Sequence, residues 1–292
     1  MNKYPNNAKF AVCLTHDIDR VKKTHQYFTR FVRFLKRKHI RAAVNEIYNF
    51  FRFYFSDIKK DPYWPGRIID IEGKLGVKST FFFLNETKKT NWFNPKEWKL
   101  SFGRYKIDDP GVVEFIKRID NEGWEVGLHG SYDSYKDKNL LSKEKEKLEG
   151  ILGKEIYGIR QHYLNLNIPE TWKIQKELGI KYDSSFGSVN EFVNDKPFHP
   201  FDDANFLVIP LVIMDTGLFS KNDDIEFIFK KFKKLIDIVE KENGVITLNW
   251  HYYNEYEFPG EAKLYRKIID ICKEKGAWIA TCSDVVQWIN KK

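Results

Sequence analysis

The segment FAVCLTHDID, residues 10–19, decides the fold of this chain more than any other. Five apolar residues, Phe10 to Leu14, lead into a polar end that holds two carboxylates, Asp17 and Asp19. Because side chains alternate along a β-strand, the two carboxylates project to the same side. Such close negative charges are tolerated if a cation lies between them, or if one is a base and the other a ligand. The alternative is a polar turn at the end of a strand.

The composition is that of a folded, globular protein. The 292 residues suit one large α/β domain or two modest ones. The hydrophobic fraction of 42% and the charged fraction of 31% exclude a disordered chain. The net charge of +8 favours anionic partners such as acidic glycans, phosphate groups or membrane surfaces. No nucleic-acid motif accompanies this charge, so no nucleic-acid partner is expected.

The cysteines and the N-terminal segment bear on the compartment. Cys13, Cys272 and Cys282 fall in apolar contexts and are expected to be reduced and buried. The first ten residues, MNKYPNNAKF, contain no hydrophobic signal region. No apolar run approaches the roughly 18 residues of a transmembrane helix. These features predict a cytoplasmic protein.

Short apolar segments alternate with amphipathic ones along the chain, as expected for parallel strands covered by helices. Strands are predicted at residues 9–15, 78–84, 125–128, 156–159, 206–214, 245–249 and 278–281, with a shorter one near 180–182. Helical spacing marks residues 112–119 and 225–239. Asn222 to Asp224 are capping candidates for the second helix.

Seven or eight βα repeats predict an irregular (β/α) barrel of seven or eight strands, formed as one domain by residues 1–292. An open, doubly wound sheet is the alternative. The chain contains no GxGxxG or P-loop segment, which argues against nucleotide binding. In a barrel, chemistry gathers at the carboxyl ends of the strands, and the unusual polar residues follow the predicted strands there.

A basic, aromatic, helical insertion at about residues 22–62 interrupts the repeat after the first strand. Its apolar side chains form two stripes: Phe28, Phe31, Val32 and Leu35 in one, and Val44, Ile47, Tyr48, Phe51 and Phe55 in the other. The other faces carry Arg30, Arg33, Lys36, Arg37, Lys38 and Arg41. One interpretation is a pair of helices that cap the barrel with a solvated basic face. The other is peripheral contact with a membrane surface or an anionic glycan.

Five strand-end segments together resemble the motifs of the polysaccharide deacetylase family, carbohydrate esterase family 4. In chain order they are THDID (15–19), HGSYD (129–133), RQHY (160–163), YDSSF (182–186) and LNWH (248–251). The segment KSTFFF, residues 78–83, is also similar to the second strand of that family. The resemblance covers roughly residues 8–290, with the helical insertion as an addition.

The resemblance implies roles for the best-matched residues. Asp17 corresponds to the catalytic base and Asp19 to a metal ligand. Arg160 corresponds to the arginine that orients the base through a charge-assisted hydrogen bond. His251 corresponds to the general acid that protonates the leaving amine. Amide hydrolysis needs these parts because water must be activated and its proton taken.

Two positions depart from the family pattern. The second motif keeps His129, but Asp133 stands where a second histidine is usual. Asp133 either ligates the metal through oxygen or does not reach it. In the third motif His162 replaces proline, and it is a compensating metal ligand, a substrate contact or a loop histidine bonded to backbone. Since strand ends converge in a barrel, we expect His162 within about 5 Å of His129.

The remaining polar and aromatic candidates are substrate contacts. Asp183 is expected to orient the arginine and line the pocket, or else to form a turn with the neighbouring serines. Asp215 ends an apolar run and could bind a sugar hydroxyl, assist His251 or cap a helix. Tyr163 and Trp250 complete the predicted contacts. His16 points away from its acidic neighbours by alternation and is interpreted as structural.

The resemblance implies a metal-dependent hydrolase that removes an acetyl group from an N-acetylated sugar or glycan. Its divalent metal, expected to be zinc, would be held by Asp19 and His129 with Asp133 or His162. The basic insertion and the cytoplasm suggest a phosphorylated or lipid-linked substrate. One alternative is hydrolysis of another non-peptide C–N bond. Another is a metal-free glycan-binding or assembly module, which the missing second histidine favours and the combination of base, orienting arginine and acid disfavours.

Overall fold

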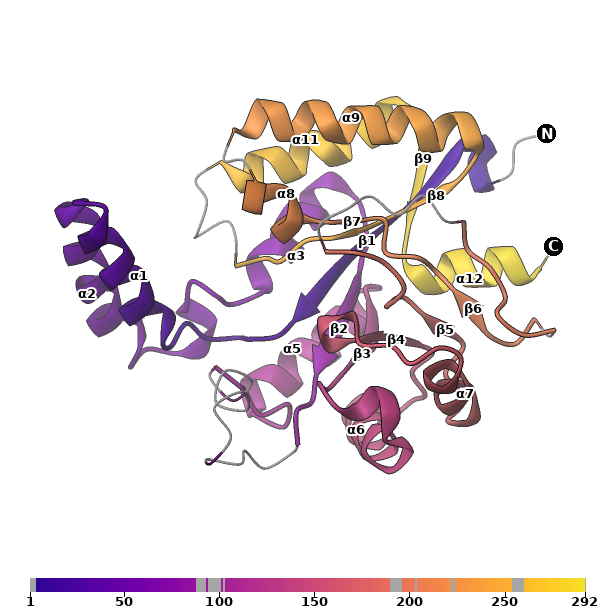
Figure 1. Ribbon diagram of the computed structural model, residues 1–292, viewed down its shortest axis with the longest axis horizontal. Coiled ribbons are helices and arrows are strands. Elements are labelled where there is room, and N and C mark those ends of the chain that lie inside the picture. Colours follow the sequence, from indigo (N-terminus) through magenta and orange to yellow (C-terminus); the bar gives the residue numbers. More distant parts are fainter. Residues whose placement is uncertain are drawn as a thin grey trace.

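A computed structural model describes residues 4–87, 93, 101, 103–189, 196–202, 204–221, 224–253 and 260–291. Within these residues nine strands form one sheet, in which all the ladders are parallel (Figure 1). The strands are β1 (Phe10–Ile18), β2 (Thr80–Leu84), β3 (Glu125–Gly130), β4 (Gly158–Gln161), β5 (Tyr182–Asp183), β6 (Leu207–Val208), β7 (Ile213–Met214), β8 (Val245–Asn249) and β9 (Ala277–Ala280).

Helices connect the strands, with α9 packed beside α11 and α5 beside α6 (Figure 1). The helices are α1 (Gln26–Lys36), α2 (Ile40–Phe53), α3 (Gly66–Leu75), α5 (Pro110–Asn121), α6 (Lys138–Leu152), α7 (Glu170–Glu177), α8 (Asp215–Lys221), α9 (Ile225–Glu242), α11 (Glu261–Glu274) and α12 (Cys282–Asn290). Short 3-10 turns lie at Pro5–Asn7, Ile58–Lys60, Ser134–Lys136 and His162–Leu164. None of the described helices combines the length and apolar composition needed to cross a membrane.

The strand order is β6-β5-β4-β3-β2-β1-β8-β7, and β9 also pairs with β1. No ladder between β6 and β7 closes the ring among the described residues, so the sheet is a curled, incomplete barrel. The predicted barrel class is confirmed, and the predicted strands lie in the sheet with ends shifted by up to three residues. β8 has the predicted bounds, whereas β1 runs on to Ile18 and includes Asp17.

The prediction of one strand at residues 206–214 is wrong. The segment contains two short strands at opposite ends of the strand order: β6 pairs with β5, and β7 pairs with β8. Pro210 lies between them and lacks the N–H that a ladder requires. The chain between β6 and β7 therefore passes across the gap in the barrel instead of extending a single strand.

β1 lies within the core and positions much of the site. It pairs with β2, β8 and β9, and all nine of its residues are buried. Asp224 caps α9 by accepting from the N–H groups of Glu226 and Phe227, while Asn222 and Asp223 lie outside the described residues. The three cysteines are free and buried as predicted, and the cytoplasmic location stays a prediction.

The helical insertion forms a hairpin of α1 and α2 that projects away from the sheet (Figure 1). The interpretation that it caps the barrel is therefore wrong. Inside the hairpin, the buried Glu46 accepts from the ammonium of Lys23 and, at 2.9 Å, from Nε of Arg30. This buried ion cluster joins both helices to the segment that leaves β1.

Candidate active site

A cavity of about 280 Å³ opens where the carboxyl ends of β1, β3, β4 and β8 meet. Residues from widely separated segments line it, among them Asp17, Asp19, His129, His162, Tyr163 and His251. All six were singled out in the sequence, and the parallel sheet brings them together because their strands end at the same edge. The structure shows that all six line one cavity, whereas the chemical roles predicted for them stay predictions.

Asp17 is held by partners on two other strands. Its Oδ1 accepts from a guanidinium nitrogen of Arg160 at 2.9 Å, and its Oδ2 accepts from the amide of Asn249 at 2.7 Å. Burial would raise the pKa of Asp17, but the charge of Arg160, with His129 and His251, outweighs it and lowers that pKa. The carboxylate is therefore ionised at neutral pH and fixed in orientation.

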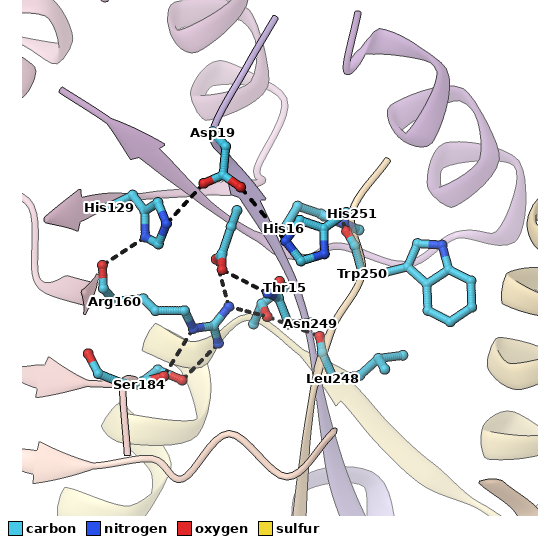
Figure 2. A network of polar contacts seen from close by, with 12 residues as sticks. Thr15, His16, Asp19, His129, Arg160, Ser184, Leu248, Asn249, Trp250 and His251 are labelled. Carbon is cyan, nitrogen blue, oxygen red and sulfur yellow. Dashed lines mark hydrogen bonds and ion pairs between the residues drawn. The ribbon is translucent and has the colours of Figure 1, made fainter. Parts of the chain in front are cut away.

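Arg160 is fully buried and bonded through each nitrogen of its guanidinium (Figure 2). Besides Asp17, it donates to Oγ1 of Thr15 at 2.7 Å and to the carbonyl and hydroxyl oxygens of Ser184 at 3.0 and 2.9 Å. Its carbon Cζ lies 4.6 Å from the centre of the Phe82 ring. These contacts fix the guanidinium in one orientation. A guanidinium fixed in this way can hold the carboxylate of Asp17 in a defined position.

Asp19, His129 and His162 form a compact cluster, with one possible ligand atom from each lying within 4.8 Å of the others. Nδ1 of His129 donates to the carbonyl oxygen of Arg160 at 2.9 Å, so Nε2 faces Asp19 at 3.2 Å (Figure 2). Nε2 of His162 lies 3.7 Å from the same Asp19 oxygen. Burial opposes ionisation of Asp19, but the three nearby histidines hold its pKa far below the usual value.

The donors of this cluster fit a divalent metal. Burial lowers the pKa of His162 to about 4, so its imidazole is neutral, as a metal ligand must be. Nδ1 of His162 is buried without a hydrogen-bond partner among the described residues. One carboxylate and two imidazoles are a donor set typical of catalytic zinc sites, which keep a position for water or substrate. The metal implied by the sequence resemblance thus matches the residues present.

His251 is oriented by Asp215. Nδ1 of His251 lies 2.7 Å from one carboxylate oxygen of Asp215, and its backbone N–H donates to the other at 2.5 Å. Nε2 lies 3.9 Å from Asp19, at the cavity. Burial would lower the pKa of His251, but Asp215 outweighs burial and raises it to about 9. This shift favours a protonated imidazole at neutral pH. Asp215 also begins α8 and accepts from the backbone N–H of Thr216 at 2.6 Å, so both the contact with His251 and the capping role considered for it are observed.

Comparison with solved structures identifies the architecture. A protein of Mycobacterium smegmatis assigned as a polysaccharide deacetylase matches with a TM-score of 0.63 and 17% identity, over 99% of this chain and 92% of the other. A Pseudomonas aeruginosa protein with the same assignment matches with a TM-score of 0.65 and 14% identity, over 100% of this chain and 94% of the other. The fold is that of the polysaccharide deacetylases. Neither protein-family models nor curated protein sequences give a match.

Within the polysaccharide deacetylase fold, Asp133 does not join the cluster of Asp19, His129 and His162. Its carboxylate lies 3.6 Å from Nζ of Lys136, one turn further along the chain. The residue precedes a 3-10 turn, and it does not line the cavity. His162 lies instead beside His129, with 5.2 Å between the ring centres, close to the distance predicted. The structure thus favours His162 over Asp133 as the third ligand.

Two predicted substrate contacts are placed elsewhere. Asp183 is fully buried and accepts from the backbone and hydroxyl of Ser185 and from Gln175, so the alternative of a turn is correct. The next residue, Ser184, is the one that contacts Arg160. Trp250 is also buried, and its ring packs 5.1 Å from that of Tyr265, away from the cluster (Figure 2). Tyr163, which is 62% exposed, does line the cavity.

Sequence reasoning missed two supports of the base, Asn249 and Thr15. Both were quoted in motifs, but neither was given a role. They are neighbours in the register of β1 and β8, and Asn249 lies at the very end of its strand. A polar residue that ends an apolar parallel strand is the signal that could have found Asn249.

Proposed function

We propose that this chain is a metal-dependent hydrolase that removes the acetyl group from the nitrogen of an N-acetylated sugar. The observation that carries the proposal is that Asp17, held by Arg160 and Asn249, and His251, held by Asp215, line the same cavity, and their pKa values are shifted in opposite directions. Opposite protonation states on two neighbouring groups are what a base and an acid in one reaction need. The polysaccharide deacetylase fold adds support for the reaction class.

Asp17 is proposed to take a proton from the attacking water. Each of its oxygens already accepts one hydrogen bond, from Arg160 or Asn249, and a carboxylate oxygen can accept another. Arg160 and Asn249 fix the plane of the carboxylate, so the free lone pairs keep one direction. The same bonds favour the ionised form, in which Asp17 can act as a base.

Asp19, His129 and His162 are proposed to hold one divalent metal, with zinc as the best fit to the ligand set. Such a metal, when bound, lowers the pKa of water and polarises an acetyl carbonyl. The hydrogen bond from His129 to the carbonyl of Arg160 keeps its other nitrogen directed at the cluster. Arg160 thereby supports both the base, through its side chain, and a ligand, through its backbone.

His251 is proposed to give the proton on Nε2 to the leaving nitrogen. Water oxygen adds to the acetyl carbon, Asp17 gains the water proton, and the C–N bond breaks as His251 protonates the amine. The products are acetate and a free amino sugar. Asp215 keeps its bond to Nδ1 throughout and stabilises the charged ring before transfer.

The proposed substrate is a sugar derivative that carries an anionic group. Arg20 and Arg104 line the cavity together with the exposed ring of Tyr163. An arginine pair suits a phosphate, and an aromatic face suits a sugar ring. A phosphorylated or lipid-linked N-acetyl sugar carries both groups, and a cytoplasmic enzyme, which we also propose, would meet such intermediates.

The two carboxylates of β1 provide the test. Asp17→Asn should keep the metal content of the purified protein but lower acetate release by about 10²–10⁴-fold, because only the base is lost. Asp19→Asn should lose both metal and activity, because a ligand is lost. Asp133→Asn is the matched control, and it should retain both.

Metal content is measured on natively purified protein, and acetate release on phosphorylated N-acetylglucosamine derivatives. Metal loss in Asp17→Asn would assign that residue to the ligands and contradict the division of roles. Metal loss in Asp133→Asn would restore Asp133 as a ligand. Full activity in Asp17→Asn would refute the proposed mechanism.

A further inference from the structure

The α1–α2 hairpin exposes an unusual amount of apolar surface. Phe28 is 70% exposed, Phe51 67% and Phe55 78%, and Ile40 and Val44 exceed half exposure. Soluble monomers seldom expose large contiguous apolar patches without a partner. Because the hairpin projects from the body, no other part of the described chain covers this face (Figure 1).

The apolar side chains of the two helices share one groove. It encloses about 530 Å³ and is lined by Phe28 and Phe31 from α1 and by Ile47, Phe50 and Phe51 from α2. On α2, Ile40, Val44, Ile47 and Phe51 follow at intervals of three or four residues and therefore form one stripe. The hairpin thus has a single apolar face to which both helices contribute.

Exposed cations lie on the same two helices as this apolar face. Between residues 26 and 53 the chain has seven lysines and arginines and one acidic residue, a surplus of six of the net charge of +8. That acidic residue is Glu46, which is buried and bonded to Lys23 and Arg30. The other six cations of this segment are exposed: Arg33, Lys36, Arg37, Lys38, Arg41 and Arg52.

We propose that the α1–α2 hairpin binds the surface of a membrane that contains anionic lipids. Its apolar face would enter the boundary between headgroups and acyl chains, and the cations would pair with lipid phosphates. Charge complementarity favours this partner over a second copy of the chain. A symmetric dimer through this face would bring two strongly positive hairpins together, and repulsion between like charges opposes such association.

The hairpin is also directly linked to the cavity. Arg20 lines the active-site cavity, and Thr24 and His25 line the apolar groove a few residues later. The hairpin therefore leaves the sheet at the edge that carries the active site. Membrane binding through it would hold that edge close to the lipid surface.

Vesicle co-sedimentation of the full chain tests the proposal, using phosphatidylcholine with and without phosphatidylglycerol. We expect wild type to bind vesicles that contain phosphatidylglycerol and to bind phosphatidylcholine alone much more weakly. A cation at an anionic surface is worth about a fivefold change in partition, so Arg33→Gln/Arg37→Gln should weaken binding roughly 25-fold. Phe28→Ser/Phe51→Ser should weaken it at least tenfold, because two rings no longer enter the lipid.

Matched controls lie on α9, away from the hairpin. Phe227 and Ile238 are 43% and 48% exposed, and Lys230 and Lys233 are exposed cations. Phe227→Ser/Ile238→Ser and Lys230→Gln/Lys233→Gln should bind vesicles like wild type. Circular dichroism and thermal unfolding of every variant should match wild type, since the altered side chains are exposed.

Three results would overturn the proposal. The first is failure of wild type to bind vesicles that contain phosphatidylglycerol. The second is equal binding by the hairpin variants and the α9 controls. The third is a wild-type dimer in analytical ultracentrifugation that Phe28→Ser/Phe51→Ser converts to a monomer, which would assign the face to a second copy.

Discussion

Two buried histidine–carboxylate pairs, His16 with Glu72 and His251 with Asp215, differ in what their second ring nitrogen meets. His16 is held at both nitrogens, by the carbonyl oxygen of Trp250 at 2.7 Å and by Glu72 at 2.9 Å. His251 is held at Nδ1 by Asp215, and its Nε2 faces the cavity. A ring bonded to protein on both sides cannot pass a proton to a substrate, whereas His251 can. Both rings are buried, so the structural histidine and the reactive one are distinguished by what the second ring nitrogen contacts.

The surroundings of Glu72 explain why the first pair is structural. Glu72 also accepts from the hydroxyls of Ser79 and Tyr265 and from the indole of Trp124. Burial would raise the pKa of Glu72, but the charge and hydrogen bond of His16 outweigh it and lower that pKa. The pair therefore binds β1 to α3 and α11 through a saturated set of hydrogen bonds, with no capacity left for a ligand.

The largest expected effect breaks the reactive pair. His251→Ala should lower kcat/KM for acetate release by about 10²–10⁴-fold, because the leaving amine loses its proton donor. The substitution should change the free energy of unfolding far less than the activation free energy of the reaction, since the ring borders a cavity. Steady-state kinetics and urea unfolding of the same preparation measure both quantities, and unchanged kinetics would remove His251 from the mechanism.

Breaking the structural pair should have the opposite signature. His16→Gln should lower the free energy of unfolding by about 1–3 kcal/mol, because Glu72 stays buried without its bond to Nε2 of His16. Activity per folded molecule should be nearly normal, since His16 faces away from the cavity. A specific loss of kcat in fully folded His16→Gln would contradict the distinction drawn between the two pairs.

A pH profile sharpens the comparison further. The pKa of His251 is raised to about 9, so wild-type activity should hold to that pH and fall above it as the acid deprotonates. Asp215→Asn should move the alkaline limb toward the ordinary histidine pKa of about 6.5. The raised pKa of His251 also stabilises the folded protein, fully at pH values below the pKa that this histidine has in the unfolded chain. That stabilisation is lost as the pH rises through about 9. In Glu72→Gln the alkaline limb should stay in place.

The smallest effect concerns a cavity residue that belongs to neither pair. Tyr163→Ala should raise KM a few-fold and leave kcat nearly unchanged, because an exposed ring at the cavity contributes substrate binding of about 1 kcal/mol. Tyr163→Phe is the matched control, and it should behave like wild type if stacking is the contact. A large fall in kcat would give Tyr163 a part in the chemistry.

The features that could be predicted from sequence were those set by the alternation of side chains along a strand and by the convergence of parallel strand ends. Alternation along β1 correctly separated His16 from Asp17 and Asp19. Convergence of parallel strand ends correctly brought His162 near His129. Both follow from geometry that every strand or barrel shares, so no knowledge of distant partners was needed.

The features that were missed depend on partners far along the chain. Asn249 reaches Asp17 across 232 positions, and no local pattern reports that contact. Asp183 matched a motif by residue type, but Ser184 is the residue whose side chain turns toward Arg160. A shift of one residue in a strand changes the face, so motif matching alone could not decide between them.

The central position of β1 has a consequence for how the protein is made. This strand is synthesised before its partners β8 and β9, and the amide of Asn249 lies 232 positions after Asp17 in the chain. The base therefore gains its full support only after β8 has been synthesised. Contacts this distant in sequence slow folding, and the nascent chain must carry an apolar β1 without its later partners until then. Catalytic activity would accordingly report completion of the whole barrel, since no N-terminal fragment could assemble the site.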